Sequence, residues 1–127
     1  MEYAKSQIRV NELPEPVNPL SYAISAGPLI FVSGQTPRNP KTGQVPDGIE
    51  EQTHQVFRNI DAVLKAAGSS LADVLKVTAY LSDLSDRNRF NEIYRQYLSE
   101  PYPARTSIGC QLEGIRLEID VIALARR

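Results

Sequence analysis

The sequence predicts an α+β fold in which two helices cover one face of a mixed sheet of about six strands. Two segments with apolar residues at helical spacing are interleaved with shorter apolar or alternating segments. The resulting order strand–helix–strand–helix–strand favours a single layer of helices on a single sheet. A length of 127 residues with 42% hydrophobic residues fits one packed domain, residues 1–127.

The first third of the chain predicts strands separated by turns. Residues 8–10 are expected to form a short first strand, and a proline-rich connector follows it. Residues 21–26 alternate weakly between apolar and polar side chains. Residues 29–34 are apolar at both phases, which is typical of a strand covered on both faces. Residues 36–46 are rich in turn formers and predict a loop.

Two helices follow from apolar positions that share one helical face. Asp47 and Glu50 have the spacing of a capping box at the start of the first helix, and Gly68 suits its end. Ser85 is a candidate N-cap for the second helix, and Pro101 ends it. The apolar faces consist of Ile49, Val56, Ile60, Val63, Leu64 and Ala67 in the first helix and Phe90, Ile93, Tyr94, Tyr97 and Leu98 in the second.

Three further strands are predicted at 74–81, 104–112 and 115–125. Alternation assigns each side chain of a strand to one face of the sheet. The more apolar phase of each of the last two strands is expected to face the helices: Thr106, Ile108, Cys110 and Leu112 in one, and Ile115, Leu117, Ile119, Val121 and Ala123 in the other. This assignment places Arg105 and Glu118 together on the helix-free face.

The connection between the last two strands leaves two arrangements open. A tight hairpin at Glu113-Gly114 would hold Arg105 and Glu118 several residues apart, which is too far for direct contact at about 3.3 Å per residue. Either another strand lies between the two strands, or a site that uses both side chains takes them from different subunits. Ile122 also lies on the helix-free face, and an apolar open sheet face indicates an interface. Self-association with cyclic symmetry would place ligand clefts between copies.

Composition excludes several classes of function. The net charge of −1, with both signs interspersed, gives no pull toward nucleic acid. Cys110 is the only cysteine, so no internal disulfide can form and a reducing compartment is expected; we read it as a core residue. The start of the chain lacks the apolar core of a signal peptide, and no apolar run reaches membrane-spanning length, so a soluble cytoplasmic protein is expected. No cluster of ligands supports a metal, and His54 is expected to be solvated.

Arg105 and Glu118 are the residues that carry chemistry. Arg105 enters a predicted strand directly after a proline-defined turn, and a fixed guanidinium can hold a carboxylate through two parallel hydrogen bonds. Glu118 can handle a water molecule as a general base. The pair indicates an enzyme that acts on a small acid without a covalent nucleophile. An ordinary salt bridge for Arg105 and a solvated position for Glu118 are the alternatives.

Short landmarks along most of the chain, in this order and spacing, resemble one known family, the reactive intermediate deaminases, also called RidA, YjgF or L-PSP proteins. The landmarks are Asn18-Pro19-Leu20-Ser21, Val32-Ser33-Gly34-Gln35, Asn39-Pro40-Lys41-Thr42-Gly43, Ala66-Ala67-Gly68-Ser69-Ser70-Leu71, Val74-Leu75-Lys76-Val77-Thr78, Phe90-Asn91-Glu92-Ile93-Tyr94, Pro103-Ala104-Arg105 and Leu117-Glu118-Ile119-Asp120.

The resemblance implies a chorismate-mutase-like α+β fold, a homotrimer and active sites in clefts between subunits. It implies hydrolysis of enamines and imines, such as 2-aminoacrylate and 2-imino acids, to 2-oxo acids and ammonia, without a cofactor. Such an enzyme would be a 2-iminobutanoate/2-iminopropanoate deaminase-like hydrolase. Arg105 would bind the substrate carboxylate and Glu118 would position or activate water. Ser33 and Asn91 match positions that line the family's pocket.

Two positions depart from the family pattern, and other activities stay open. Leu20 stands where a tyrosine is common, and Ser107 stands where a cysteine is frequent; both are expected to contact substrate. The alternatives are an endoribonuclease or translation inhibitor, and a non-catalytic trimer that binds small carboxylates. Nucleic acid is the less favoured partner because phosphate binding usually needs a basic patch. Several imines are possible substrates, and an aminomuconate-type compound is one of them.

Overall fold

The computed structural model describes residues 4–126, so Met1–Tyr3 and Arg127 of the predicted domain lie outside the described residues. Six strands, two α-helices and two short 3-10 helices follow one another along the chain. In order they are β1 (Ser6–Ile8), β2 (Ala23–Ala26), β3 (Leu29–Gln35), α1 (Gly48–Ala66), η1 (Leu71–Asp73), β4 (Val74–Leu81), η2 (Leu84–Asp86), α2 (Arg87–Tyr97), β5 (Ala104–Gly109) and β6 (Leu117–Leu124).

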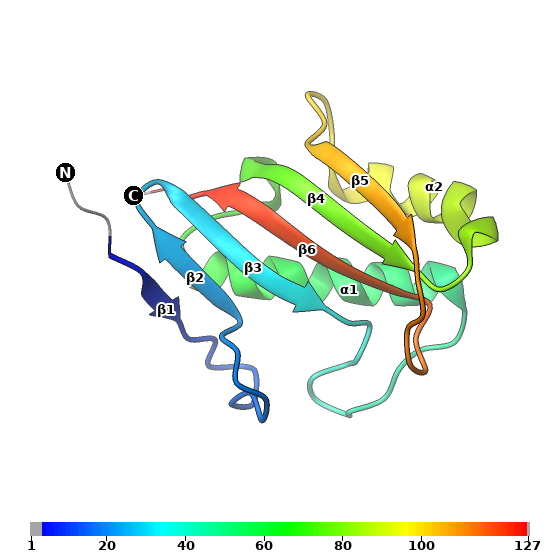
Figure 1. Cartoon of the computed structure of the whole chain (residues 1–127), viewed down its shortest axis with the longest axis horizontal. Coiled ribbons are helices and arrows are strands. Elements are labelled where there is room, and N and C mark those ends of the chain that lie inside the picture. Colours follow the sequence, from blue (N-terminus) through cyan, green and yellow to red (C-terminus); the bar gives the residue numbers. More distant parts are fainter. Residues whose placement is uncertain (1–3, 127) are drawn as a thin grey trace.

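The strands form one mixed sheet in the order β1-β2-β3-β6-β4-β5. All neighbouring pairs are antiparallel except β4 and β5, which are parallel and are connected through α2. Both helices lie behind the sheet and leave its other face uncovered (Figure 1). The predicted α+β class, the six strands and the single helical layer are therefore confirmed.

The helix boundaries agree with the predicted caps at one helix and differ at the other. Helix α1 starts after Asp47, although the Asp47 side chain makes no capping hydrogen bond, and it ends before Gly68, whose φ of 75° suits a glycine. The prediction of Ser85 as N-cap of α2 is wrong. Ser85 belongs to η2, where its backbone N–H donates to the Asp83 side chain, and Asp86 is the N-cap of α2. The sequence pattern does not show that a 3-10 helix, Leu84–Asp86, lies directly before α2 and contains Ser85.

One hydrophobic core joins both helices to the sheet. Phe57 of α1 is almost fully buried and stacks on Tyr97 of α2 at 4.7 Å between ring centroids. It also meets Tyr94 edge to face at 5.9 Å. These ring contacts connect the two helices, and they fix the side of α2 that carries Tyr94. One cluster therefore spans both layers.

Buried amide side chains on α1 hold the long loop that follows β3. Asn59 donates from Nδ2 to the carbonyl oxygens of Thr36 and Arg38, each at 2.9 Å. Gln52 donates to the carbonyl of Pro46 at 2.9 Å and accepts from the backbone N–H of Arg116 at 2.8 Å. The amide side chains of Asn59 and Gln52 thus form hydrogen bonds with the backbone of the loops. Because their polar atoms are paired, these side chains can lie on a buried face of the helix.

The faces of the last strand are as predicted, whereas those of β5 are reversed. In β6, Leu117 and Ile119 are fully buried under the helices, and Glu118 lies on the open face. In β5, Arg105 is the Cα partner of Val77, which is fully buried, so Arg105 shares the helix-facing side. Ile108 instead lies on the open face and is 43% exposed. The prediction that Arg105 occupies the helix-free face is therefore wrong.

The error has a physical cause. β5 is the edge strand, and alternation of hydrophobicity is weak there because neither of its sides is fully covered. The strand is also shorter than predicted and ends at Gly109, so Cys110 and Leu112 lie outside it. Gly109 fits closely under η2, since a Cβ there would approach Leu84 Cγ to 2.9 Å. No hairpin joins β5 to β6, because β4 lies between them.

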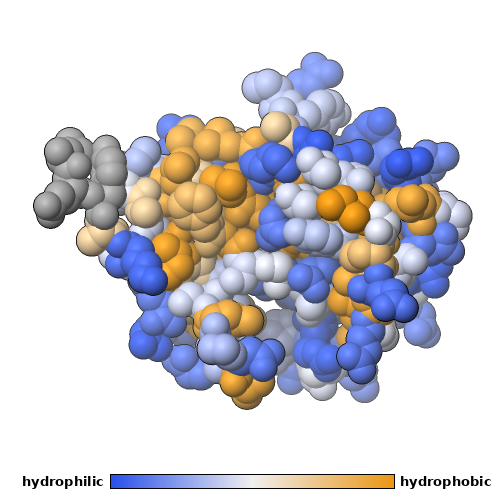
Figure 2. Space-filling model, in the orientation of Figure 1, coloured by the Kyte–Doolittle hydropathy of each residue, from blue (hydrophilic) through white to orange (hydrophobic). Residues whose placement is uncertain are grey.

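The open face of the sheet carries an apolar patch on its outer half. Phe31 is 41% exposed and is the Cα partner of Ile24 on one side and of Ile122 on the other. Leu29 and Leu124 are Cα partners two residues further along, which places them on the same face. Figure 2 shows hydrophobic surface over these neighbouring strands. Across residues 4–126, no helix combines the length and the apolar character that a membrane span needs.

The aromatic contact between the helices generates a stability prediction. Replacing Phe57 by alanine removes a buried ring and leaves a cavity between α1 and α2, so we expect the free energy of unfolding to fall by about 3–5 kcal/mol. Urea denaturation followed by circular dichroism, at one fixed protein concentration, measures this change. Val17→Ala is the control, because Val17 is almost completely exposed. A similar loss for both variants would contradict the assignment of Phe57 to the core.

Candidate functional site

Arg105 lies on aromatic rings instead of against a carboxylate. The parallel pairing of β5 with β4 places its side chain beside the buried face of α2. Its guanidinium carbon is 4.7 Å from the centroid of the Tyr94 ring and 5.5 Å from that of Phe90. Both distances are within the range of cation–π contacts. Because the rings hold the guanidinium by its face, its N–H groups stay available to a ligand.

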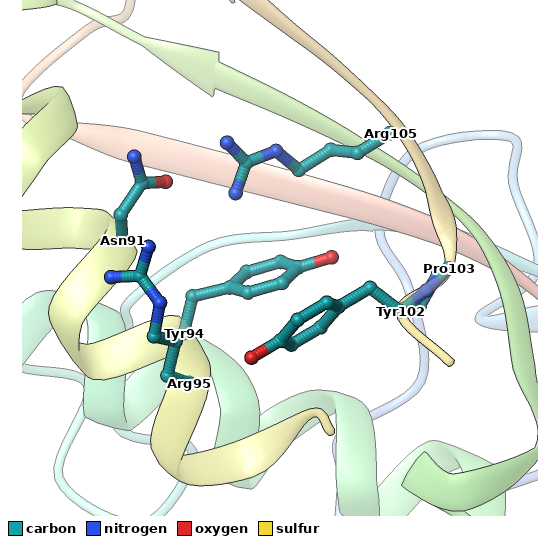
Figure 3. A pocket seen from close by; sticks show the side chains of 6 residues that line it. All are labelled: Asn91, Tyr94, Arg95, Tyr102, Pro103 and Arg105. Atoms are coloured by element: carbon teal, nitrogen blue, oxygen red, sulfur yellow. The ribbon is translucent and has the colours of Figure 1, made fainter. Parts of the chain in front are cut away.

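A cavity of about 230 Å³ opens beside this guanidinium. It is lined by Asn91, Tyr94, Arg95, Tyr102, Pro103 and Arg105. Figure 3 shows Arg105 reaching from β5 over the Tyr94 ring toward Asn91 and Arg95 on α2. The cavity therefore joins one strand end to one face of one helix, and its charge is positive.

Three buried polar atoms near Arg105 have no hydrogen-bond partner within residues 4–126. They are Asn91 Oδ1, Tyr94 Oη and, on the same face of β5, Ser107 Oγ. Buried polar groups in folded proteins are nearly always paired, so three such atoms around one arginine indicate a place for a polar ligand. Burial raises the pKa of Tyr94, and the positive charge of Arg105 acts in the opposite direction.

Glu118 belongs to a second group of residues on the open face. Its carboxylate lies against Gly34 of β3, where a Cβ atom would come within 2.1 Å of Glu118 Oε2. Any side chain at position 34 would therefore displace the carboxylate. The pairing of β3 with β6 shifts register between Val32 and Gln35, which brings this glycine beside the glutamate.

The surroundings of Glu118 favour its protonated form. Burial raises the pKa of this carboxyl, and the negative charge of Asp120 two residues along the same face raises it further. Asp120 accepts a hydrogen bond from Tyr80 Oη at 2.9 Å. Glu118 is therefore better suited to exchange protons near neutral pH than an exposed glutamate.

Ser33 and Leu20 lie near Gly34 in a separate hollow of about 210 Å³. The Ser33 hydroxyl donates to the carbonyl of Ser21 at 2.5 Å, which ties β3 to the segment before β2. Leu20 is 48% exposed and lines the rim. Asn18, from the segment before β2, and Thr36, directly after β3, line the same hollow.

The structure thus divides the predicted site residues into two groups. Asn91, Arg105 and Ser107 form the α2/β5 group on the helix side of the sheet. Leu20, Ser33 and Glu118, with Gly34, form the β3/β6 group on the open face. The two groups do not meet within one chain, because β4 separates β5 from β6 and the two key side chains point to opposite faces.

Sequence analysis missed four residues of these groups: Tyr94, Arg95, Tyr102 and Gly34. Tyr94 was read only as helix core, and it is both buried and part of the cavity wall. Its spacing of four residues from Phe90 was the available signal, because that spacing stacks two rings on one helix face. Arg95 and Tyr102 had no signal, since their relation to Arg105 depends on the crossover through α2. Gly34 likewise depends on the pairing of β3 with β6.

Two other predicted positions differ in detail. His54 is not simply solvated, because its Nδ1 lies 2.6 Å from Tyr97 Oη across the helix pair. Cys110 follows the end of β5 and is half-buried, so it is not a core residue. Within the described part of the chain, no group of three or more His, Cys, Asp or Glu side chains could hold a metal ion.

The environment of Glu118 generates a prediction about its pKa. Asp120→Asn removes a nearby negative charge while keeping an acceptor for Tyr80, so we expect the pKa of Glu118 to fall toward its ordinary value. The ¹³C chemical shift of the Glu118 carboxyl, followed against pH, measures the change. Asp83→Asn is the control, because Asp83 is exposed and pairs locally with Ser85. An unchanged Glu118 titration in Asp120→Asn would show that Asp120 does not act on it.

Comparisons with known proteins agree with this architecture. A family model described as Endoribonuclease L-PSP matches residues 10–125. A RutC family protein of Pyrococcus horikoshii is 44% identical over 122 residues, covering 94% of this chain and 97% of the relative. The human 2-iminobutanoate/2-iminopropanoate deaminase is 36% identical over 120 residues, covering 92% of this chain and 88% of the relative.

Solved structures show the same fold. The crystal structure of Escherichia coli TdcF with bound serine has a TM-score of 0.87 and 32% sequence identity, covering 95% of this chain and 99% of that chain. The family model spans nearly all the described residues, and the sequence relatives cover almost their full lengths. The chain therefore belongs to the L-PSP family, which is also known as the RidA or YjgF family.

Proposed function

We propose that this protein hydrolyses 2-imino acids and their enamine tautomers to 2-oxo acids and ammonia. The observation that carries the proposal is the guanidinium of Arg105, held on two rings in a cavity with unpartnered polar atoms. Such a group is suited to a small carboxylate. The human relative is named for deamination of 2-iminobutanoate and 2-iminopropanoate, and TdcF was crystallised with serine, an amino acid.

The proposal includes assembly as a homotrimer. The α2/β5 group of one copy would face the β3/β6 group of the next, so that each cleft contains one Arg105 and one Glu118. Two features support this arrangement: the two groups lie on opposite faces of one sheet, and the open face carries an apolar patch around Phe31. Cyclic symmetry would repeat the same contact at each interface.

Arg105 would bind the substrate carboxylate through two parallel hydrogen bonds. Charged hydrogen bonds contribute about 1.5–3 kcal/mol each, and the planar fork also orients the substrate. Asn91 Oδ1 can accept from the N–H of a protonated imine, since it is buried without another partner. Ser107 is expected to contribute through its hydroxyl or backbone on the same face of β5.

Glu118 would handle the water. In the proposed step, the water oxygen bonds to C2 of the protonated imine while Glu118 accepts one water proton, which gives a carbinolamine. Glu118 then returns this proton to the nitrogen. The C–N bond breaks and ammonia leaves as the C2=O bond forms, while Glu118 accepts the hydroxyl proton and passes it to the departing ammonia as ammonium. General base catalysis of this kind contributes about 10²–10⁴-fold. Imines hydrolyse readily in water, so positioning and one base suffice.

Ser33 and Leu20 would complete the cleft from the β3/β6 side. Leu20 cannot donate a hydrogen bond, so we infer that water there is held by backbone groups and by Glu118. The single domain and the cytoplasmic location stay predictions. The ribonuclease alternative requires a basic surface for phosphates, which a net charge of −1 does not favour.

The role of Arg105 predicts the behaviour of two substitutions. Arg105→Ala removes the carboxylate clamp and should lower kcat/KM at least about 100-fold. Arg105→Lys keeps the positive charge without the planar fork, so its kcat/KM should lie between those of the wild type and of Arg105→Ala. The assay couples a serine dehydratase that releases 2-aminoacrylate to this protein and follows formation of pyruvate.

Arg87→Ala is the matched control for this experiment, because Arg87 is an exposed arginine at the start of α2 and does not line the cavity. Normal turnover by Arg105→Ala would remove Arg105 from the mechanism. Binding of 2-oxo acids by the wild type without accelerated ammonia release would instead favour the non-catalytic alternative.

The shared cleft predicts complementation between two inactive variants. Co-expressed Arg105→Ala and Glu118→Gln chains should regain about a third of the wild-type activity in mixed trimers, because one of the three interfaces in each mixed trimer pairs an intact arginine with an intact glutamate. Each variant alone should stay inactive. Purification through two different tags isolates the mixed species, and a lack of any regained activity would show that both groups come from one chain.

A further inference from the structure

The cavity beside Arg105 contains a second guanidinium. Arg95 lies one helical turn after Asn91 on α2, and both side chains line the cavity with Arg105. Figure 3 shows Arg95 and Asn91 side by side on the helix, with Arg105 approaching from β5 across the Tyr94 ring. Two positive charges therefore border one space of about 230 Å³.

Among the residues that the structure describes, no carboxylate forms an ion pair with either guanidinium. The ion pairs among residues 4–126 involve other cations, namely Arg9, Lys65, Arg89, Arg116 and Arg126. Glu92, the acidic residue nearest to Arg95 on the helix, pairs with Arg89 instead. Position 91, one turn before Arg95, holds an uncharged asparagine. The local sequence of α2 thus leaves Arg95 available at the rim.

Like charges around one cavity are stabilised when an anion with two negative groups lies between them. The first negative group has its place at Arg105, where a substrate carboxylate would bind. The second would lie toward the rim, within reach of Arg95. The unpartnered Asn91 Oδ1 is turned toward Arg105 in Figure 3, where the nitrogen of the substrate needs a polar contact.

We infer that this site prefers imino acids with a second carboxylate, such as the imines of aspartate and glutamate. Arg105 binds the carboxylate next to the imine carbon, and Arg95 binds the carboxylate at the end of the side chain. This inference rests on the proposed imine hydrolysis and adds its substrate class. Arg95 is the specificity-determining residue, and it takes no part in the chemical step.

The test compares two substrates of similar length that differ in the second carboxylate. An amino acid oxidase generates the imine of glutamate or the imine of norvaline, and trapping with semicarbazide measures how fast each imine disappears. We expect Arg95→Gln to lower kcat/KM for the glutamate imine roughly tenfold, because a partly exposed charged hydrogen bond is lost. The norvaline imine should change less than twofold. Arg87→Gln, an exposed arginine on the same helix, should change neither.

Binding of stable products provides a second readout that does not need turnover. Calorimetry at fixed ionic strength should show that Arg95→Gln weakens 2-oxoglutarate roughly tenfold and leaves 2-oxopentanoate unchanged, whereas Arg105→Ala weakens both. Equal losses for both ligands in Arg95→Gln, or the same loss in Arg87→Gln, would overturn the preference and leave the proposed hydrolysis intact. Failure of the wild type to accelerate hydrolysis of any imine would overturn the proposed function, and the substrate class with it.

Discussion

The contact between the Arg105 guanidinium and the rings of Tyr94 and Phe90 determines what the rest of this molecule can do. A guanidinium against a carboxylate is already neutralised, and its N–H groups are occupied. A guanidinium on an aromatic face is held in place, while its donors still point outward. The aromatic packing of α1 against α2 supports this placement, because Phe57 meets Tyr94 edge to face. The hydrophobic core and the proposed binding group are therefore connected through one cluster of aromatic rings.

The second requirement is a carboxylate that is more basic than an exposed glutamate. Burial and the negative charge of Asp120 both raise the pKa of Glu118 in this direction. The close approach of the carboxylate to Gly34 shows how tightly β3 and β6 enclose it. The backbone at Gly34 does not have a positive φ, so the neighbouring glutamate, and not the local conformation, is what demands glycine there.

Much of the architecture could be predicted from the sequence, because the strong apolar periodicity of α1, β4 and β6 defines buried faces without ambiguity. Residue chemistry and a family resemblance also predict Arg105 and Glu118 as site residues, and their roles stay predictions. The face of Arg105 could not be predicted. β5 is a short edge strand whose Ile108 is exposed, so hydrophobicity assigns its faces in the wrong sense. Neighbours such as Tyr102 and Arg95 follow only from the parallel crossover, which brings the end of α2 beside β5.

The proposed binding residues on the helix occupy one turn of α2, from Asn91 to Arg95, and Arg95 itself is exposed. Substitutions at an exposed helical position rarely disturb packing. Selectivity among related proteins can therefore diverge through single replacements on this turn, without compensating changes in the sheet that carries the glutamate. Paralogues within one genome could in this way share the same chemistry and divide the available metabolites among themselves.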